Sequence, residues 1–166
     1  MGILDKIVEF KRKRYTNKVR QTCSSCGSGL KVNGKSIVNS NTQLGDNVNF
    51  NGMSIQGNGK VKIGSNFHSG IECMMITDFH NYEGDAIPYD STVISKEIII
   101  EDNVWIGNRV IILGGSHIKE GAIIQAGSVV VGEIGKYAIA GGHPAKEFKK
   151  RNIEHYEQLK KEKKFH

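Results

Sequence analysis

The second half of the chain carries an aliphatic residue at every sixth position. The series comprises Ile100, Ile106, Ile112, Ile118, Ile124 and Val130. An α-helix repeats about every 3.6 residues and a strand about every two, so a period of six fits neither element unless turns are interspersed. It fits a three-sided coil of roughly 18 residues, in which each side is a short strand and the aliphatic side chains point inward and stack on the coil below.

Small and turn-forming residues stand between these aliphatic positions. They include residues 101–103 (Glu-Asp-Asn), Gly107 with Asn108, Gly114 with Gly115, Gly121 and Gly127. Glycine and asparagine tolerate the positive φ angles that tight corners demand. The spacing therefore predicts a corner after each short strand.

The same pattern begins earlier in the chain. Leu44–Val48 and Ile63–Phe67 repeat the order of residues in Ile100–Val104, with an apolar residue at each end and a turn pair between. The first residues of these segments are 19 and 37 positions apart, each one more than a multiple of 18. Two single-residue irregularities are therefore predicted within the coil.

We expect Gly52 and residues 57–59 to absorb the first irregularity, and a loop across 77–97 to absorb the second. From about residue 30 to residue 143 the repeat gives about six coils, which form a prism about 30 Å long. An antiparallel β-sandwich rich in glycine is the alternative. It requires polar and apolar residues that alternate at a period of two, which these segments lack.

The predicted fold class is all-β, with one α-helix at each end. A parallel β-helix spans residues 23–144 with the inserted loop 77–97, a capping helix spans 1–22 and a C-terminal helix spans 145–166. The N-terminal helix is indicated by apolar residues at helical spacings, Ile3, Leu4, Ile7, Val8 and Phe10. The C-terminal helix is indicated by Ala145, Phe148, Ile153, Tyr156 and Leu159.

Helices are expected there because each end of a β-helix exposes unpaired strand edge. The N-terminal helix is predicted to cover the first coil. Docking of this basic helix on a membrane surface is the alternative. The cap is favoured over it, because one short helix of this kind binds lipid only weakly. Membrane contact is therefore expected to be peripheral at most.

The formal net charge of +6 resides at the two ends of the chain. Residues 1–22 hold seven Lys and Arg against two Asp and Glu, and residues 145–166 hold eight against four. Residues 23–144 hold eight against eleven, so the body is mildly acidic. The sparse aromatic residues are not interleaved with the basic runs, as binding of single-stranded nucleic acid requires. No nucleic-acid partner is expected.

The three cysteines show no spacing typical of a disulfide framework. Cys73 is expected to be a small buried residue, and no second Cys or His pair accompanies Cys23 and Cys26 to complete a zinc site. No metal is expected. The first ten residues are too short and too charged for a signal peptide, and no apolar run approaches the roughly 18 residues needed to cross a membrane. The expected location is cytoplasmic.

The largest departure from the repeat is the segment 77–97, which is too polar to continue the inward stack. It is expected to project from the prism, and long loops in compact repeat folds are usually functional. It contains His80, Tyr82, Pro88 and Tyr89. Because the pKa of a histidine lies near 6.5, His80 is suited to accept a proton in a reaction at neutral pH.

Residues 49–146 resemble the hexapeptide-repeat acetyltransferases, in particular the branch that includes the galactoside and maltose acetyltransferases and the polysaccharide O-acetyltransferases. The motifs that carry the resemblance are Asn103-Val104-Trp105-Ile106-Gly107, Ala126-Gly127-Ser128-Val129-Val130 and Gly141-Gly142-His143-Pro144-Ala145-Lys146. The loop that comes after Ile63-Gly64-Ser65-Asn66 also contains a histidine, His80, at the place where this family keeps its catalytic histidine.

The resemblance implies a left-handed β-helix, a homotrimer with active sites between neighbouring prisms, and direct transfer of an acetyl group from acetyl-coenzyme A to a sugar hydroxyl, with a role in surface polysaccharide biosynthesis. It implies that His80 is the general base. For the cofactor it implies contacts by Trp105, Ala126, Gly127 and Lys146, and for the acceptor sugar by Asn49, to which we add Asn58 and Tyr82.

Two departures from the family pattern affect these assignments. Val131-Gly132 stands where relatives carry Thr-Lys, which removes a basic contact to the cofactor, and Lys149, Lys150 and Arg151 are expected to replace it. Asn58 stands where the galactoside enzymes carry an acidic acceptor ligand, so the acceptor need not be a pyranose like theirs. The amine of a nucleotide-linked amino sugar and the hydroxyl of a small drug-like alcohol remain alternative acceptors.

Two further classes of protein compete with this interpretation. Zinc carbonic anhydrases are built on the same type of helix, but they need two histidines five residues apart, and His117 is followed at that spacing by Ala122. A binding scaffold without activity is the other alternative. It leaves the polar loop and His80 without a role.

Overall fold

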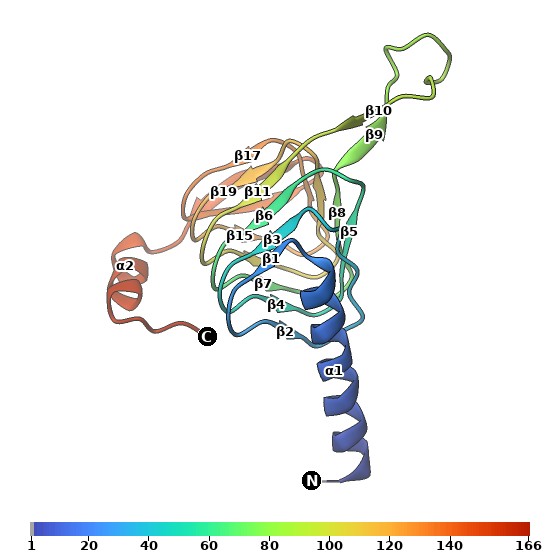
Figure 1. Cartoon of the computed structure of the whole chain (residues 1–166). Coiled ribbons are helices and arrows are strands. Elements are labelled where there is room, and N and C mark those ends of the chain that lie inside the picture. The colour runs from blue at the N-terminus through green and yellow to red at the C-terminus, as the bar shows by residue number, and fades with distance from the viewer. Residues whose placement is uncertain (1) are drawn as a thin grey trace.

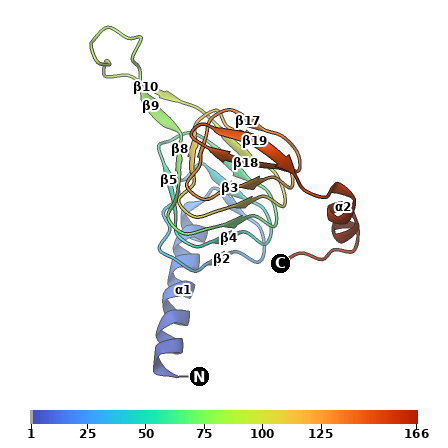
Figure 2. The same ribbon diagram turned by 180° about the vertical axis from the view of Figure 1, so that it is seen from behind.

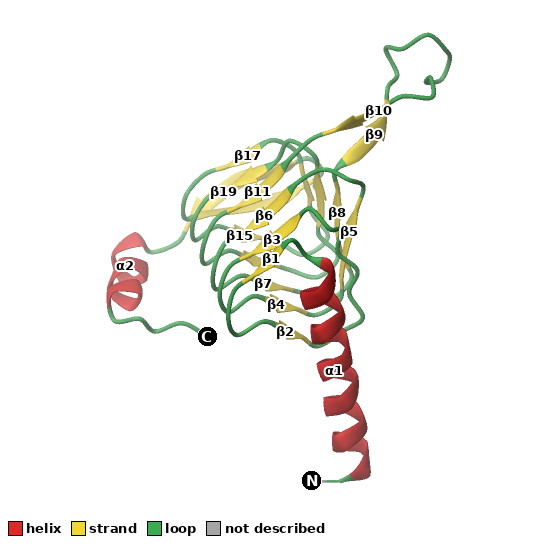
Figure 3. Ribbon diagram, viewed as in Figure 1, coloured by secondary structure: helices red, strands yellow, loops and turns green. Residues whose placement is uncertain are grey.

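The computed structural model describes residues 2–166 and shows a left-handed parallel β-helix with a helix at each end. Three sheets form the three sides of the coil, and their strands pair in parallel from one coil to the next, except that β19 pairs antiparallel with β18 (Figures 1 and 3). The predicted fold class is confirmed.

The first sheet contains β1 (Ser25–Cys26), β3 (Thr42–Leu44), β6 (Val61–Ile63), β11 (Ile98–Ile100), β14 (His117–Ile118) and β17 (Glu133–Ile134). The second sheet contains β2 (Lys31–Val32), β4 (Asn49–Phe50), β7 (His68–Ser69), β12 (Trp105–Ile106), β15 (Ile123–Ile124), β18 (Ala138–Gly142) and β19 (Ala145–Lys150). The third sheet contains β5 (Met53–Gln56), β8 (Cys73–Ile76), β13 (Ile111–Leu113) and β16 (Val129–Val130).

The interior is the stack of aliphatic residues that the period of six predicts. Each of the six is at most 1% exposed: Ile100, Ile106, Ile112, Ile118, Ile124 and Val130. They form ladders from one coil to the next, with Ile100 paired to Ile118, Ile106 to Ile124 and Ile112 to Val130. One core therefore runs the length of the coil.

The register confirms both predicted irregularities. Leu44 pairs with Ile63, and Ile63 pairs with Ile100, so the strands align across separations of 19 and 37 residues. Gly52 and Gly57 lie in the turns on either side of β5 and have φ angles of +116° and +88°. The second irregularity falls in the segment between β8 and β11.

Asparagines stack at the corner between the first and second sheets. Asn47, Asn66 and Asn103 all have positive φ angles, between 53° and 61°. The Asn47 side chain donates to Asn66 Oδ1 at 3.0 Å, and Asn66 donates to Asn103 Oδ1 at 2.8 Å. Asn103 Nδ2 then donates to the hydroxyl of Tyr156 at 2.8 Å. This ladder links three coils to the C-terminal helix.

The predicted projecting loop is an arm that begins and ends as a hairpin. Its strands β9 (Asp78–His80) and β10 (Val93–Ser95) pair antiparallel, with His80 opposite Val93. Figures 1 and 2 show that the arm extends well beyond the prism. Its projection was predicted correctly, while its two strands were not foreseen.

The N-terminal helix α1 (Ile3–Thr22) corrects the prediction of a cap over the first coil. Val19 is its one buried residue, and Tyr15 packs partly against the core. The preceding turns extend past the β2 end of the coil (Figure 1). The helix therefore covers the first coil only with its final turns. Its more N-terminal apolar residues lie beyond the coil and have no sheet beside them.

The C-terminal segment is a strand before it is a helix, so the prediction of a helix from Ala145 was wrong at its start. Ala145–Lys150 form β19, which pairs antiparallel with β18 and covers the last edge of the second sheet. Phe148 is 58% exposed and lies on this strand. Helix α2 (Ile153–Lys161) follows and begins at Asn152, whose side chain caps it. No helix within residues 2–166 is long and apolar enough to cross a membrane.

Candidate active site

A pocket of about 470 Å³ opens over the second sheet. Its floor consists of outward-facing side chains on consecutive strands, since Asn49 pairs with His68 and His68 pairs with Trp105. The wall of the pocket that faces this floor comes from Arg151, from α2 and from the segment after α2. Its residues are Arg151, Tyr156, Leu159, Lys160, Lys164, Phe165 and His166. Three residues predicted from the sequence therefore line one pocket: Asn49, Trp105 and Arg151.

Glu120 holds α2 against the coil and so shapes this wall. Its carboxylate accepts hydrogen bonds from the Tyr156 hydroxyl at 3.0 Å and from Lys160, and Lys136 Nζ lies 3.1 Å away. Burial on its own raises the pKa of Glu120, but the hydrogen bonds from Lys160, Lys136 and Tyr156 outweigh it and lower that pKa below its ordinary value. The ionised carboxylate therefore fixes the helix.

Arg151 is fixed as well. Its guanidinium donates to the Gly121 carbonyl at 3.2 Å and lies over the Tyr156 ring, 4.9 Å from the ring centroid. Arginine combines such stacking with directed hydrogen bonds because its guanidinium is planar. A cation thus stands at the edge of the pocket in a defined position.

His68 lies in the pocket floor and was not singled out from the sequence. Its Nε2 lies 3.2 Å from Asn51 Nδ2, and its ring centroid is 6.0 Å from that of His166. Burial, together with the neighbouring His166, lowers the pKa of His68, so the neutral form is favoured. The register already contained the signal, because position 68 falls in line with Asn49 and Trp105.

Asn49 is held by its neighbours in the first coils. Its Oδ1 accepts a hydrogen bond from Asn33 Nδ2 at 2.9 Å, and Asn33 also donates to Asn51 Oδ1 at 2.9 Å. Asn49 lines the pocket, and with its oxygen engaged its side chain has two amide N–H donors to offer. It is suited to donate to a hydroxyl or carbonyl oxygen of a ligand.

His80 lies at the exposed end of β9, on the arm and away from the pocket. Its imidazole stacks on the ring of Tyr89 with centroids 3.9 Å apart and planes 7° from parallel. Within residues 2–166 no hydrogen bond to the His80 ring nitrogens is present, so the stack is what orients the ring there. Tyr82 is on the same arm and is 67% exposed.

The base of the arm is fixed to the corner that contains Asn58. Asp78 Oδ2 accepts from the Asn58 backbone N–H at 2.8 Å, and Asp78 Oδ1 accepts from the Ser95 hydroxyl at 2.7 Å and from the Gly59 N–H at 3.1 Å. Burial on its own raises the pKa of Asp78, and these hydrogen bonds lower it further than burial raises it. A Cβ at Gly59 would meet Thr77 Cβ at 2.6 Å. The hairpin is therefore held firmly where it leaves the prism.

The remaining residues predicted to bind the cofactor lie at the last coils. Ala126 and Gly127 form an exposed corner between the second and third sheets, where the Gly127 N–H donates to the Asn108 carbonyl at 2.8 Å and its φ is +73°. A side-chain nitrogen of His143 contacts the Gly127 carbonyl. Lys146 and Lys149 are exposed on β19. These residues form a strip separate from the His80 arm.

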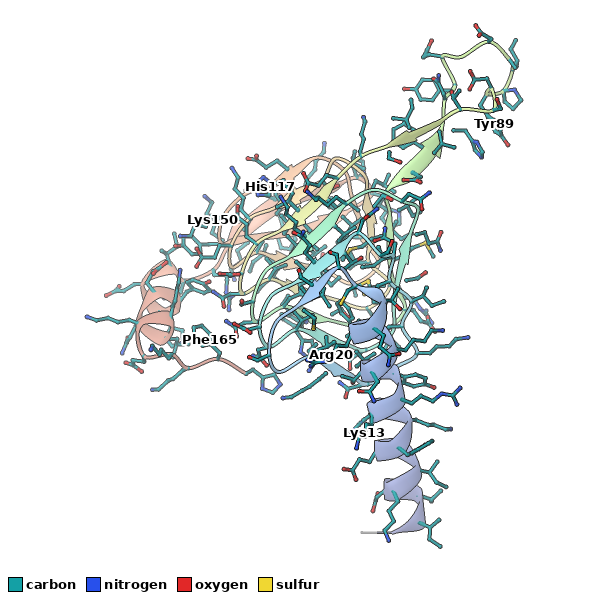
Figure 4. All side chains as sticks on the ribbon, in the orientation of Figure 1. Lys13, Arg20, Tyr89, His117, Lys150 and Phe165 are labelled. Atoms are coloured by element: carbon teal, nitrogen blue, oxygen red, sulfur yellow. The ribbon has the colours of Figure 1, made fainter. Side chains whose placement is uncertain are left out.

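The structure thus places the predicted residues in three regions of one chain. Asn49, Trp105 and Arg151 line the pocket, Ala126 and Gly127 with Lys146 and Lys149 lie along the last coils, and His80 with Tyr82 lies on the arm, whose base holds Asn58. Figure 4 shows Tyr89 on the arm and Phe165 near the opposite side of the molecule. His80 therefore does not meet the pocket of its own chain.

The described residues contain no group of three or more His, Cys, Asp or Glu side chains placed to hold a metal ion. Cys73 is buried, as predicted, and burial raises the pKa of its thiol. Cys23 and Cys26 are both free and partly buried at the junction of α1 with the coil. Within residues 2–166 neither pairs with a third ligand.

Comparison with known families identifies the repeat. The family model described as bacterial transferase hexapeptide (six repeats) matches residues 97–132. Among solved structures, a galactoside acetyltransferase in complex with coenzyme A superimposes with a TM-score of 0.74 and 25% sequence identity, covering 84% of this chain and 71% of that one. The resemblance found from the sequence is confirmed by both the repeat and the fold.

Sequence relatives of this chain carry acetyltransferase names. A chloramphenicol acetyltransferase of Agrobacterium fabrum is 36% identical over 76 residues, which is 46% of this chain and 34% of that protein. A putative lipopolysaccharide biosynthesis O-acetyl transferase, WbbJ, of Escherichia coli K12 is 41% identical over 69 residues, 41% of this chain and 35% of that protein. The chain thus spans about a third of the length of each.

Proposed function

We propose that this chain, which carries the repeats and the coil of the bacterial hexapeptide transferases, is an O-acetyltransferase that moves an acetyl group from acetyl-coenzyme A to a sugar hydroxyl. The observation that carries the proposal is the placement of His80. It is an exposed imidazole, oriented by Tyr89, on an arm that leaves the prism from a firmly held base. Such a side chain is suited to act on a substrate held by another surface.

His80 is assigned the role of general base. Its neutral imidazole takes the proton of the acceptor hydroxyl as the hydroxyl oxygen attacks the thioester carbonyl. When the resulting tetrahedral centre collapses, the carbon–sulfur bond breaks and the imidazolium returns that proton to the sulfur, so that coenzyme A leaves as the thiol. Backbone N–H groups at the glycine-rich corners of the coil can stabilise the oxyanion, since their donors are already oriented. Acetyl transfer by this route needs no covalent intermediate on the protein.

The active protein is assigned as a homotrimer, in which the arm of one subunit reaches the pocket of its neighbour. The outer face of the third sheet supports this assignment. On β8, β13 and β16 the outward positions are apolar and only half-buried in the single chain, whereas β5 presents Ser54 and Gln56; the apolar positions are Met74, Ile76, Ile111, Leu113 and Val129. The first sheet instead presents polar and charged side chains, with an ion pair from Lys62 to Glu97 and a hydrogen bond between His117 and Glu101. An apolar face of this kind is typical of a subunit interface.

Coenzyme A is assigned to the last coils, between neighbouring subunits. The Ala126–Gly127 corner has open space where a Gly127 side chain would be, so backbone can approach a pantetheine chain closely. Lys146 and Lys149 on β19 and Arg151 beyond it offer cations for the phosphates. Trp105, which is 52% exposed, forms an apolar wall near the thioester.

The acceptor is assigned to the pocket over the second sheet. Asn49 supplies amide donors and Trp105 supplies an aromatic surface. Lys160 and Lys164 of the pocket are paired with Glu120 and Glu162, which leaves Arg151 to favour an acceptor that carries negative charge. A sugar of a surface polysaccharide, presented on a phosphate-bearing carrier, fits these features, and the likeness to WbbJ supports it. The match to a chloramphenicol acetyltransferase favours a small drug-like alcohol as the second candidate.

The test is a thiol-release assay with acetyl-coenzyme A and a panel of acceptors. The panel contains neutral sugars, nucleotide-linked sugars, nucleotide-linked amino sugars and chloramphenicol. Release that depends on a sugar hydroxyl supports the assignment, and release that depends only on chloramphenicol replaces it with the second candidate. An enzyme that acts only on an amino sugar is an N-acetyltransferase. Absence of coenzyme A binding by calorimetry contradicts the transferase assignment altogether.

A further inference from the structure

Helix α1 leaves most of its length without contact to the rest of the chain. Val19 is its one buried residue, Tyr15 packs partly against the core, and Thr16 Oγ1 accepts the Val32 N–H at 3.1 Å. The preceding turns extend beyond the β2 end of the coil with the N-terminus at the far tip, as Figures 1 and 2 show. The prism therefore holds this helix by one end only.

The free part of α1 carries an exposed apolar face. Ile3, Leu4 and Phe10 are 79%, 77% and 68% exposed, and Ile7 and Val8 are about half exposed. These five residues lie on one half of the helix surface, because at about 100° per residue their positions span an arc of about 160°. The two acidic residues of the helix, Asp5 and Glu9, lie on the other half. An unpaired apolar face of this size usually marks an interaction site.

A belt of cations follows the apolar tip. Lys11, Arg12, Lys13 and Arg14 form the next turn, and all four are exposed. None of the ion pairs among residues 2–166 involves a cation of α1, and Figure 4 shows Lys13 on the part of the helix that extends beyond the coil. The positive charge of α1 is thus available to an anionic partner.

We propose that α1 docks the protein on an anionic lipid surface. The apolar tip enters the boundary between headgroups and acyl chains, while the long stems of the lysines and arginines lie along the interface and place their charges at the lipid phosphates. The attraction is electrostatic as well as hydrophobic, so it falls when the bilayer is neutral. This inference does not depend on the proposed transferase activity.

Two other occupants fit the helix less well. A coiled coil with a second copy requires apolar residues to continue at the heptad positions, but the seam through Ile3, Ile7 and Phe10 meets Arg14 and then Asn17. A nucleic acid would use the cations and leave the apolar tip in water. A lipid surface satisfies both the tip and the belt.

Flotation of the full chain with lipid vesicles tests the inference. Vesicles of phosphatidylcholine with about 30 mol% phosphatidylserine should bind the protein at least about tenfold more strongly than pure phosphatidylcholine, and added salt should weaken the binding. Reversal of the four belt charges (Lys11→Glu, Arg12→Glu, Lys13→Glu, Arg14→Glu) should reduce the partition coefficient by about tenfold or more. Ile3→Ser combined with Ile7→Ser and Phe10→Ser should do the same without a change in charge.

A variant with four reversals elsewhere, Lys35→Glu with Lys60→Glu, Lys161→Glu and Lys163→Glu, has the same net charge as the belt variant and should bind vesicles nearly as well as the parent. Far-ultraviolet circular dichroism checks that every variant is folded. The inference is overturned if neutral and anionic vesicles bind equally, if neither set of α1 substitutions weakens binding, or if the parent binds no vesicle at low salt. It is equally overturned if only the apolar substitutions weaken vesicle binding and they do so by dissociating an oligomer.

Discussion

The imidazole of His80 lies parallel to the phenol ring of Tyr89, with the two ring centroids 3.9 Å apart. Both side chains belong to the arm, so the stack is local and travels with the arm wherever it reaches. A histidine that acts as a base needs a defined ring position more than it needs burial, because proton transfer requires hydrogen-bond distance to the substrate. Tyr89 is therefore assigned as a positioning residue.

Replacement of Tyr89 by Leu should lower kcat about three- to tenfold, since a stacked aromatic pair contributes about 0.5 to 1.5 kcal/mol beyond its buried area. The KM for acetyl-coenzyme A should stay within about twofold, because Tyr89 touches the base and not the cofactor strip. Tyr89→Phe keeps the stack and should restore nearly full turnover. A Phe variant as impaired as the Leu variant would show that the hydroxyl, and not the stack, is what matters.

Glu120 makes the attachment of α2 dependent on pH. Because the pKa of Glu120 is lowered in the folded protein, its stabilising effect is complete above the ordinary value of 4.5 and is lost as the pH falls through the lowered pKa. Trp105, the one tryptophan, lies in the pocket floor and should report the release of α2 by a fluorescence change in this range.

In Glu120→Gln that acid transition should be absent and α2 should be loosely held at every pH. Glu154→Gln, on the exposed side of α2, is the matched control and should keep the transition of the parent. Identical fluorescence titrations for the Glu120 variant and the parent would rule out Glu120 as the group that fixes the helix.

The aliphatic ladder should dominate stability. Ile112 is fully buried between coils, so Ile112→Ala removes interior contacts on both sides and should cost about 2 to 5 kcal/mol of unfolding free energy. Ile87, which is 99% exposed on the arm, is the matched control, and Ile87→Ala should change the unfolding free energy by less than about 0.5 kcal/mol. Denaturant titration measures both. Equal costs would contradict the ladder as the source of stability.

The outer face of the third sheet should decide the oligomeric state. Ile111 faces outward beside Met74 and Val129, so Ile111→Glu places a charge in the proposed subunit interface and should convert the trimer to monomers at micromolar concentration. Ile99→Glu makes the same change on the first sheet, beside Lys62 and His117, and should leave the trimer intact. Light scattering distinguishes these results, and a parent protein that is monomeric contradicts the assignment directly.

The fold was predictable because every coil repeats the same physical requirement. Each aliphatic residue such as Ile106 or Ile124 must point inward to escape water, and the spacing of six leaves only one register that satisfies all of them. The extra residues near Gly52 and in the arm were visible for the same reason, since they shift the register by one. Periodicity thus fixes both the coil and its interruptions.

The ends were less predictable because no repeat constrains them. The spacing of Ala145 and Phe148 is compatible with a helix or with a strand. The segment forms a strand because the edge of β18 has unpaired backbone groups with which it can pair. The apolar residues of α1 indicated a helix correctly, but nothing in the sequence showed whether the coil or another partner covers them. The periodic spacing of apolar residues shows that a helix has an apolar face, but it does not show what that face contacts.

The candidate site was predictable in part. Asn49 and Trp105 meet His68 because they occupy equivalent positions on successive coils, and the register alone would have located all three. Glu120 and Tyr156 were not foreseen, since their contact depends on the path of α2 after β19. The place of His80 relative to a pocket also could not be read from one chain, because the arm reaches away from its own prism.

The most direct measurement is the turnover of His80→Ala on an acceptor that the parent clearly acetylates. We predict that kcat falls at least about 10²-fold, because a general base contributes about 10² to 10⁴ to the rate. Acetyl-coenzyme A affinity and trimer assembly should be unchanged, because His80 contacts neither the cofactor strip nor the apolar face of the third sheet. His117→Ala, on the first sheet and bonded to Glu101, is the matched control and should keep most of the activity. A His80→Ala protein that retains more than about a tenth of the parent turnover would contradict the assignment of His80 as the base.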